Sequence, residues 1–588
     1  MRPRSLDRGR AFPFKDNEIE MTQQVLPWWK TATGYQIYPR SFCDSNGDGI
    51  GDLPGVISKL DHLNDLGIGF IWLSPIYASP MRDNGYDISD YHDIVPEFGT
   101  MDDFDRLLVE ARERDIRIVM DLVVNHCSSD HLWFQKACAD ANCAEHDFFY
   151  WRDPQPDGSP PDDQRACFGG SAWHWAPAVG KYCYCHFGPQ QPDLNWHNPR
   201  LRDEIYDMMN WWLDKGIGGF RMDVIELIGK DIDGREYHEG PDMHRFIQEM
   251  HRRCLAGRDI LTVGETWAAT PDTALKYCAK DRDELNMVFN FNHVQAAWDP
   301  ELGRFGPNRF DLRTHKMILN DWQQALANDG WNSLYLSNHD LPRAVSHYGD
   351  DKSHRARSAK MLAIVHYLMK GTPFIYQGEE IGMTNAQFTS LDQFRDIETL
   401  GQLDERLGEE GSNHRNEESV AAFLVSANEN GRDNARTPVQ WNGSEFAGFS
   451  DAASWIDVNA NYQRINVEKD RDDPDGVFEL YRKIIDLRRS MPVFTQGSFE
   501  LLLPDHPHVF AFIRRWGSQE VLVAGNFSDK LAEFDLPLTF ALGWSPLLMA
   551  EIGEFCAKPD VLSPYFGGVW IREVGDQDPQ QIVVPCDD

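Results

Sequence analysis

The sequence has few positive charges for its length. Its 588 residues include 57 Lys and Arg against 93 Asp and Glu, a formal net charge of −36, and 17 of the 57 cations are Lys. Nucleic acids and anionic membrane surfaces bind basic surfaces, so this composition argues against both as partners. Uninterrupted apolar runs stay below the ~18 residues of a membrane span, and we expect no such span.

The amino terminus lacks the apolar segment of a secretory signal. Residues 1–20 are charged, and the pattern of the fold begins only at Met21. We therefore expect residues 1–20 to be a disordered extension or a misassigned start, and the protein to be cytoplasmic.

The cysteines lack the usual spacing of a metal site. Five of the eleven lie within one short window, at Cys138, Cys143, Cys167, Cys183 and Cys185. Their spacings, C-x4-C and C-x-C, differ from the common zinc pattern. Because an export signal is also missing, we expect buried or partly buried free thiols rather than disulfides.

Short apolar runs recur along the chain, and most are followed by a helical pattern. Eight of them are predicted as strands: residues 34–39, 69–75, 116–124, 219–224, 260–266, 287–291, 332–340 and 373–378. Eight strand-then-helix units predict an α/β fold, the (β/α)8 TIM barrel, in which polar residues at the carboxyl ends of the strands form the active site.

The connections between these units predict the domain organisation. We expect the barrel to comprise residues 21–126 and 197–492, with a small polar insertion at 384–436 after the eighth strand. The connection after strand 3, residues 127–196, is far longer than a usual loop and predicts an inserted subdomain over the barrel mouth. Alternating strand patterns in residues 493–588 predict a C-terminal antiparallel β-sandwich.

The fourth predicted strand carries two charges on one face. In residues 219–224, Phe220, Met222 and Val224 alternate with Arg221 and Asp223. We expect the guanidinium of Arg221 to favour the ionised form of Asp223. From this segment alone, a structural ion pair in a core strand is an open alternative.

Three acids at strand ends form a candidate catalytic set. Retaining cleavage of a glycosidic bond needs a carboxylate nucleophile and a nearby protonated acid. Asp223 fits the nucleophile, and Glu265, in an apolar strand without a cation beside it in sequence, fits the acid because burial should raise its pKa. Asp340, beside His339, could hold sugar hydroxyls.

Eight motifs resemble those of a known family. DLVVNH, GFRMDVIEL, VGETW and SNHD, at residues 121–126, 219–227, 263–267 and 337–340, resemble the four signature regions of the α-amylase superfamily of glycoside hydrolases. QPDLNW, GDGIGDL, YQGEEIGM and RDNARTPVQW, at residues 191–196, 47–53, 376–383 and 432–441, resemble its oligo-1,6-glucosidase and glucan 1,6-α-glucosidase branch. The resemblance implies that Asp223 is the nucleophile, Glu265 the acid/base and Asp340 the stabiliser of the transition state.

The resemblance also implies a set of sugar contacts. The matching positions are Asp83, Tyr86, His126, Phe168, Gln191, Arg221, His339, Arg432 and Arg436, with Arg432 or Arg436 bridging to Asp83. A pocket closed by such contacts admits only a chain end, which implies exo action on a small oligosaccharide.

Linkage preference depends on two further positions. Val224 and Trp267 resemble the branch that prefers α-1,6 bonds, as in isomaltose, isomalto-oligosaccharides, panose and short dextrans, and Trp267 would stack on the second sugar. Simple strand packing of Val224 is the structural alternative.

Several relatives would share every catalytic residue. These are the α-1,4-glucosidases that act on maltose or sucrose, trehalose-6-phosphate hydrolases and sucrose isomerases; a non-catalytic transporter subunit fits less well, since it needs a membrane span. Chain length preference, transglucosylation and the choice between monomer and homodimer stay open at this stage.

One acidic loop resembles a cation site. Oxygen donors alternate at Asp44, Asn46, Asp48, the Ile50 carbonyl and Asp52, a spacing similar to an EF-hand, although position twelve is Gly55 instead of glutamate. The resemblance predicts one structural Ca²⁺ or Mg²⁺ here and no organic cofactor. An acidic turn without metal is the alternative.

Overall fold

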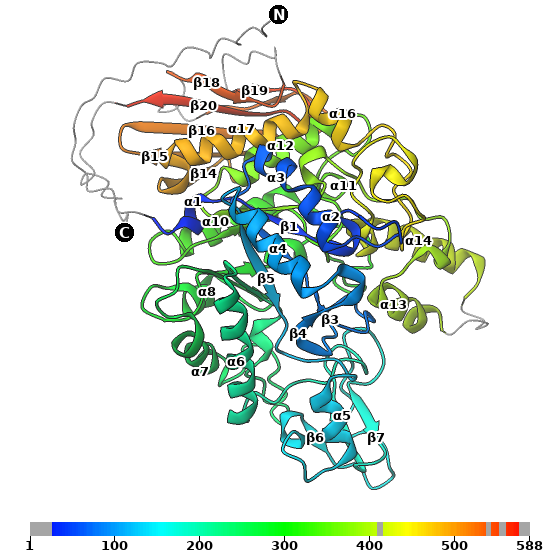
Figure 1. The fold of residues 1–588 in the computed structure, drawn as a ribbon. Coiled ribbons are helices and arrows are strands. Elements are labelled where there is room, and N and C mark those ends of the chain that lie inside the picture. The colour runs from blue at the N-terminus through cyan, green and yellow to red at the C-terminus, as the bar shows by residue number, and fades with distance from the viewer. Residues whose placement is uncertain (1–25, 409–414, 537–542, 552–559, 575–588) are drawn as a thin grey trace, which may run out of the picture.

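The computed structural model describes residues 26–408, 415–536, 543–551 and 560–574, and its centre is an eight-stranded parallel sheet rolled into a barrel (Figure 1). The strands are β1 (Gly34–Ile37), β2 (Phe70–Leu73), β5 (Arg117–Leu122), β9 (Gly219–Met222), β10 (Leu261–Thr266), β11 (Met287–Asn290), β12 (Ser333–Leu334) and β13 (Thr372–Tyr376). Each lies within or beside a range predicted as a strand, which confirms the (β/α)8 barrel.

The barrel closes through side chains at its last seam. The order of the sheet is β11-β10-β9-β5-β2-β1-β13-β12, with β1 paired to both β2 and β13. Between the end strands, the Ser333 hydroxyl donates to the carbonyl of Val288 at 2.8 Å. Tyr335 likewise donates to the carbonyl of Asn290 at 2.5 Å, so hydrogen bonds join β12 and the following residues to β11.

Large apolar side chains fill the barrel interior, including Phe70, Trp72, Phe289 and Phe374. A parallel sheet that is covered on both faces needs such continuous apolar strands. Gly219 opens β9 at a φ of 138°, and an added Cβ would lie 1.8 Å from the carbonyl oxygen of Leu261. Only glycine therefore allows β9 to approach β10 here.

Helices cover the outside of the barrel. They are α2 (Leu53–Ser58), α3 (Leu60–Leu66), α4 (Met101–Arg112), α6 (Pro199–Lys215), α7 (Met243–Met250), α8 (Pro271–Cys278), α10 (Leu312–Ala325), α11 (Ala344–Tyr348), α12 (Arg355–Tyr367) and α17 (Val477–Ser490). Local signals set their ends: Thr100 and Asp103 form a capping box at the start of α4, and Gly216 ends α6 in the left-handed conformation.

Two long excursions project from the carboxyl side of the barrel. The first, between β5 and β9, holds α5 (Leu132–Ala139) and a three-stranded sheet of β6 (Trp151–Arg152), β8 (Lys181–Tyr184) and β7 (Trp173–Ala176), at the lower end of Figure 1. The second follows β13 and holds α13 (Ile397–Leu407), α14 (Glu417–Asn430) and α15 (Asp433–Arg436). A short hairpin, β3 (Tyr77–Ala78) with β4 (Asp90–Ile94), follows β2.

The C-terminal part is antiparallel, as predicted. One sheet has the order β14 (Ser498–Leu502), β15 (Val509–Trp516), β16 (Gln519–Asn526), β20 (Gly567–Glu573) and β18 (Ser545–Met549), and β17 (Ala532–Glu533) pairs with β19 (Val561–Leu562). Helix α12 packs against β16 and β20, so the sheet is seated on the barrel (Figure 1).

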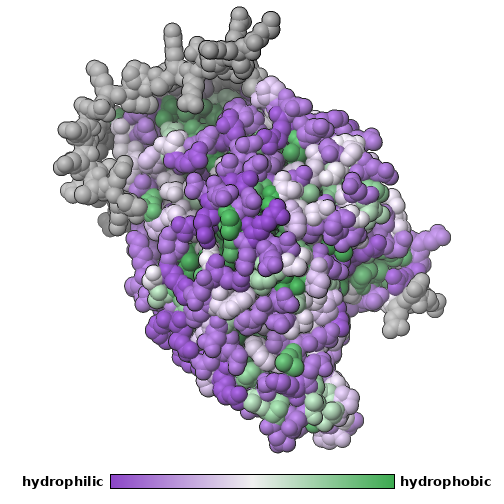
Figure 2. Space-filling model, in the orientation of Figure 1, coloured by the Kyte–Doolittle hydropathy of each residue, from purple (hydrophilic) through white to green (hydrophobic). Residues whose placement is uncertain are grey.

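Other predictions concern the surface and the thiols. All nine cysteines in the described part of the chain are free thiols; eight are buried or partly buried as expected, whereas Cys167 is exposed. Among the described helices, none has the length and apolar character needed to cross a membrane. The face in Figure 2 is mainly hydrophilic with small scattered apolar areas. The predicted extension, residues 1–20, lies outside the described residues.

Candidate active site

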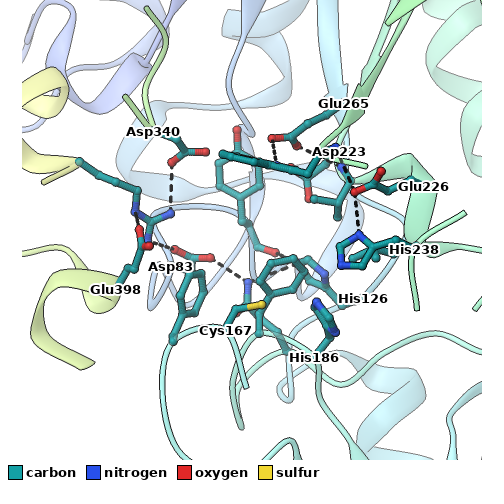
Figure 3. Close-up of a pocket in the computed structure, with 18 of the residues that line it drawn as sticks. Asp83, His126, Cys167, His186, Asp223, Glu226, His238, Glu265, Asp340 and Glu398 are labelled. Atoms are coloured by element: carbon teal, nitrogen blue, oxygen red, sulfur yellow. Dashed lines mark hydrogen bonds and ion pairs between the residues drawn. The ribbon is translucent and has the colours of Figure 1, made fainter. Parts of the chain in front are cut away.

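A pocket of about 300 Å³ opens at the carboxyl ends of the barrel strands (Figure 3). The barrel contributes one part of its wall and the two excursions contribute the rest. Its lining residues are Asp83, Tyr86, His126, Cys167, Phe168, His186, Phe187, Gln191, Asp223, Val224, Glu226, Leu227, His238, Glu265, Trp267, Trp298, Arg304, Asp340, Glu398 and Arg432.

A single guanidinium organises the carboxylates beneath the pocket. Arg221 Nη1 donates to Asp121 Oδ1 at 2.9 Å and to Asp223 Oδ1 at 2.8 Å, and Nη2 donates to Glu265 Oε2 at 2.6 Å. Arg221 is itself buried on β9. Asp223 and Glu265 are therefore both held by one cation at the carboxyl ends of adjacent strands.

The structure changes two expectations about this cluster. Arg221 was expected to pair with Asp223, and it does, but Asp121 and Glu265 share the same guanidinium. Glu265 has no cation beside it in sequence, yet in the fold it forms the shortest of these contacts. The cause is tertiary, because β9 and β10 are adjacent parallel strands with Arg221 level with Val263.

Burial raises the pKa of Asp223 well above its ordinary value and that of Asp121 to about 6, while the charge of Arg221 lowers both. One guanidinium cannot neutralise three adjacent carboxylates. Arg221 thus favours the ionised form of Asp223, as expected, but burial outweighs its effect on the pKa.

Val224 does not continue the strand as predicted. β9 ends at Met222, and Val224 adopts φ 36° and ψ 44°, the left-handed region that β-branched residues rarely enter. In this conformation its backbone N–H donates to Glu265 Oε2 at 3.1 Å. The strained turn thus supplies a second donor to Glu265 and places the Val224 side chain in the pocket wall.

Asp340 lies across the pocket from this pair, as Figure 3 shows. Arg432 Nη1 and Arg436 Nη2 donate to its Oδ1 at 3.1 and 2.9 Å, and His339 Nε2 lies 3.3 Å from its Oδ2. Burial opposes ionisation of Asp340, but His339 and the two guanidinium groups outweigh burial, so the pKa of Asp340 lies below its ordinary value.

Asp83 closes the same side of the pocket. Gln191 Nε2 donates to its Oδ2 at 2.8 Å, and Arg432 Nη2 lies 3.8 Å from its Oδ1, which is the predicted bridge. Burial raises the pKa of Asp83 to about 7, although Arg432 and Arg436 lower it.

Neutral aromatic groups lie in the pocket wall and directly behind it. Tyr86 stacks on His339 with ring centroids 5.2 Å apart and planes 6° apart. His126 Nε2 lies 3.1 Å from the Tyr86 carbonyl. Burial lowers the pKa of His126 to about 4 and that of His339 to about 3, so both rings are neutral at pH 7.

Trp267 and Phe168 both line the pocket. Trp267 stacks on Phe291 with ring centroids 3.8 Å apart, and the indole Nε1 of Trp267 donates to Glu265 Oε1 at 3.1 Å. Phe168 comes from the first excursion, and the guanidinium of Arg432 lies 5.0 Å above its ring. Arg432 comes from the second excursion, so this contact joins the two excursions at the pocket.

Most residues predicted for the site meet at this pocket. Eleven of the fourteen predicted catalytic and sugar-binding residues line it, and Arg221, His339 and Arg436 lie directly behind the lining. The other lining residues were not predicted for the site: Cys167, His186, Phe187, Glu226, Leu227, His238, Trp298, Arg304 and Glu398. Glu226 and Leu227 belong to the same motif as Asp223 and offered a signal, whereas Glu398 lies on α13 in the second excursion, where no local pattern points to the pocket.

The predicted metal residues lie on a different loop, before α2. Asp44 Oδ1 accepts the N–H of Asn46 at 2.9 Å, Asp48 Oδ1 accepts the N–H of Ile50 at 2.8 Å, and Asp52 Oδ1 accepts the N–H of Gly55 as the N-cap of α2. In the part of the chain that is described, His, Cys, Asp and Glu side chains form no group of three suited to a metal. The donors suit a hard cation, but Asp52 serves the helix cap.

The chain matches known families over most of its length. Residues 36–497 match the family described as alpha amylase, catalytic domain, and residues 499–564 match the maltogenic amylase C-terminal domain. A palatinase of Erwinia rhapontici is 50% identical over 514 residues, 87% of this chain and 92% of the relative. An oligo-1,6-glucosidase of Heyndrickxia coagulans is 48% identical over 529 residues, 87% of this chain and 94% of the relative.

A solved structure shares the whole architecture. The trehalose-6-phosphate hydrolase of Bacillus licheniformis superposes with a TM-score of 0.87 at 41% identity, covering 93% of this chain and 100% of that one. Because the catalytic-domain match spans well over half of the sequence and includes the carboxylate pocket, the chain belongs to the α-amylase family of glycoside hydrolases.

Proposed function

We propose that this enzyme is a retaining, exo-acting α-glucosidase that releases the non-reducing terminal glucose from α-1,6-linked gluco-oligosaccharides such as isomaltose. The observation that carries the proposal is the placement of Asp223 and Glu265 on the two nitrogens of the Arg221 guanidinium, at the base of a pocket that Asp83 and Asp340 line on the opposite side.

The proposed reaction has two displacement steps. Asp223 attacks the anomeric carbon while Glu265 gives its proton to the leaving oxygen, so a covalent glucosyl ester forms and the second sugar departs. Glu265 then removes a proton from water, whose oxygen attacks the anomeric carbon and frees Asp223. Arg221 remains bound to both carboxylates and spreads their changing charge.

The opposite side of the pocket supports exo action. Asp340, ionised beside Arg432 and Arg436, would stabilise positive charge on the flattened sugar ring, and Asp83 would accept hydroxyls of the terminal glucose. The Arg432 bridge between Asp83 and Asp340 crosses the place where a longer glucan would have to continue.

The charges of the pocket support a neutral substrate over a phosphorylated one. Two cationic side chains, Arg304 and Arg432, occur among the described lining residues. Arg304 donates to Glu398 at 2.7 Å and also to the Asp340 carbonyl, while Arg432 contacts Asp340 and Asp396. Both guanidinium groups are thus neutralised by carboxylates before a substrate enters.

A substrate panel tests the proposal. Initial rates on isomaltose, panose, dextran, maltose, sucrose and trehalose-6-phosphate should give the highest kcat/KM for isomaltose or panose. Higher values for maltose or for trehalose-6-phosphate would assign the enzyme to the corresponding relative, and isomaltulose formed from sucrose would assign it to the isomerases. Release of α-glucose, followed by NMR, should show retention.

The α-1,6 preference is proposed to depend on Val224, which lines the pocket beside the attacking carboxylate. In Val224→Ala the ratio of isomaltose to maltose turnover should fall about tenfold, because the branched side chain no longer restricts the aglycone. An unchanged ratio would remove Val224 from the linkage argument.

We also propose that the loop from Asp44 to Asp52 holds one Ca²⁺ or Mg²⁺. The side chains of Asp44, Asn46 and Asp48 and the Ile50 carbonyl would supply the hard oxygen ligands such an ion prefers. Its part would be to stabilise the loop before α2.

A further inference from the structure

A fourth buried carboxylate adjoins the catalytic cluster and has no part in the proposed reaction. Glu226, on the turn after β9, is fully buried. Its Oε1 accepts the N–H of Trp267 at 3.0 Å and its Oε2 accepts the N–H of Ala268 at 2.8 Å. A buried carboxylate needs such donors, and here they fix the loop that carries Trp267.

The third partner of Glu226 is a histidine in the pocket wall. His238 Nδ1 lies 2.9 Å from Glu226 Oε1, and 47% of the His238 side chain is exposed, whereas Glu226 is not exposed. Figure 3 shows the pair on the same side of the pocket as Asp223 and Glu265. Because Glu226 accepts the Nδ1–H, the second nitrogen, Nε2, is directed away from Glu226.

The loop that carries His238 is held in place. The next residue, Glu239, has a φ of 47°, its N–H donates to the Glu226 carbonyl at 3.1 Å, and Tyr277 OH donates to its carboxylate at 2.8 Å. The ring of His186 from the first excursion lies 5.9 Å from the His238 ring. His238 is therefore preorganised before substrate binds.

We propose that His238 is a specificity-determining residue for the second sugar, whose hydroxyl binds Nε2, and that Glu226 is the positioning residue that aligns His238 with Trp267. The inference rests on the proposed function, because it concerns the sugar that leaves the same site. The ligand class is a neutral, hydroxyl-bearing aglycone.

The contacts of Glu226 place this subsite on the leaving-group side. Glu226 binds the backbone of Trp267, whose indole Nε1 donates to Glu265 Oε1, the proposed proton donor. The leaving oxygen must lie against Glu265, so the sugar attached to that oxygen extends along Trp267 and His238. Besides Glu226, the titratable groups that act on His238 are Glu239, Lys230 and the neighbouring His186.

Two substrates separate this role from a structural one. Isomaltose carries a second sugar, whereas α-glucosyl fluoride carries none. His238→Asn keeps an amide donor near Glu226 but removes the second ring nitrogen, Nε2. It should lower kcat/KM for isomaltose about tenfold and change hydrolysis of glucosyl fluoride less than about twofold. His238→Gln, whose amide reaches farther, should recover part of the isomaltose activity.

His244 offers a matched control. Its Nδ1 also binds a buried glutamate, Glu284, at 2.8 Å, but it is absent from the lining of the pocket. His244→Gln should leave the ratio of the two activities unchanged.

The ratio of the two activities decides the inference. If His238→Asn lowers both activities equally, or lowers neither, the inference is wrong while the proposed function stands. A wild-type enzyme that cleaves neither substrate would instead contradict the proposed function itself.

Discussion

At the scale of single residues, Arg221 determines what the neighbouring carboxylates can do. It contacts Asp121, Asp223 and Glu265 within 2.9 Å, and the strained Val224 directs a backbone N–H at the same Glu265 oxygen. Strain and an excess of buried negative charge both cost stability, and their concentration at one site is typical of catalytic centres.

Replacing the proposed nucleophile should abolish turnover without unfolding the protein. In Asp223→Asn the attacking oxygen is lost, so kcat on isomaltose should fall at least about a thousandfold. One fewer carboxylate then competes for Arg221, so the melting temperature should be equal or higher. The exposed Asp233, paired with Arg152 at the surface, gives the control Asp233→Asn, which should retain full activity. Undiminished activity of Asp223→Asn would contradict the mechanism.

Substrate affinity should depend on the ionisation of Asp83. Burial raises its pKa to about 7, so it is ionised above that pH and protonated below it. The protonated acid is a weaker acceptor for sugar hydroxyls, and KM for isomaltose should therefore rise as the pH falls from about 8 to about 6. In Asp83→Asn the KM should be higher throughout and nearly independent of pH in this range. An Asp83→Asn profile that keeps the wild-type shape would assign the ionisation to another group.

At the scale of elements, a buried ion pair joins the first excursion to the barrel. Lys230, from the loop after β9, lies 2.7 Å from Asp193 Oδ2, and neither side chain is exposed. Lys230 Nζ also donates to Asn125 Oδ1 at 2.6 Å, and Asn125 Nδ2 lies 3.1 Å from His126 Nδ1. The orientation of His126 in the pocket thus depends on how the excursion is attached.

Breaking this pair should cost far more than breaking one at the surface. Lys230→Met leaves Asp193 buried without its cation and should lower the free energy of unfolding by about 3–5 kcal/mol in urea titrations. Lys215 forms a pair of the same 2.7 Å length with the half-exposed Asp105, and Lys215→Met should cost less than about 1 kcal/mol. Equal costs for the two variants would contradict the role of the Lys230–Asp193 pair in attaching the first excursion to the barrel.

Chelation should test the proposed cation loop. If an ion is bound at Asp44 to Asp52, EDTA should lower the melting temperature by several degrees and added Ca²⁺ should restore it, because binding to the native state stabilises it. In Asp48→Asn the response should require more Ca²⁺. A melting temperature that is unaffected by EDTA and by Ca²⁺ would favour an acidic turn without metal.

At the scale of the whole molecule, the C-terminal sheet depends on close approach to the barrel helix α12. A Cβ on Gly525 of β16 would lie 2.6 Å from Val365 Cγ1, and a Cβ on Gly567 would lie 3.0 Å from Met361 Cα. Lys316 of α10 also donates to the carbonyls of Leu503 and Val509, at 2.5 and 3.0 Å. The sheet therefore stabilises the outer side of the barrel, away from the pocket.

Enlarging a side chain at this contact should lower the free energy of unfolding without changing catalysis. Gly525→Val should lower the free energy of unfolding by about 1–3 kcal/mol or more, because overpacking separates the sheet from α12. The kcat of the folded fraction should be unchanged. A Cβ on Gly443 would meet Asn466 Nδ2 at an ordinary contact distance of 3.9 Å, so Gly443→Ala should be nearly neutral in stability. A neutral effect of Gly525→Val would contradict the tight seating of the sheet.

Much of the fold was predictable because its signals are local. Alternating and continuous apolar runs located all eight barrel strands, and Asp223, Glu265 and Asp340 follow or end such strands, where a barrel brings them together. The inserted region was also visible, since no ordinary loop needs the length between β5 and β9.

The eight-unit barrel, the C-terminal antiparallel sheet and the acids at the barrel mouth follow from local patterns, because periodicity along the chain specifies strands and strand ends. Three features emerge only in the folded molecule: Arg221 binds Glu265, 44 residues away, Val224 turns left-handed, and His238 and Glu226 adjoin the pocket. They depend on contacts between residues that are remote along the chain, which set the charge state and orientation of a buried side chain and which no local pattern records.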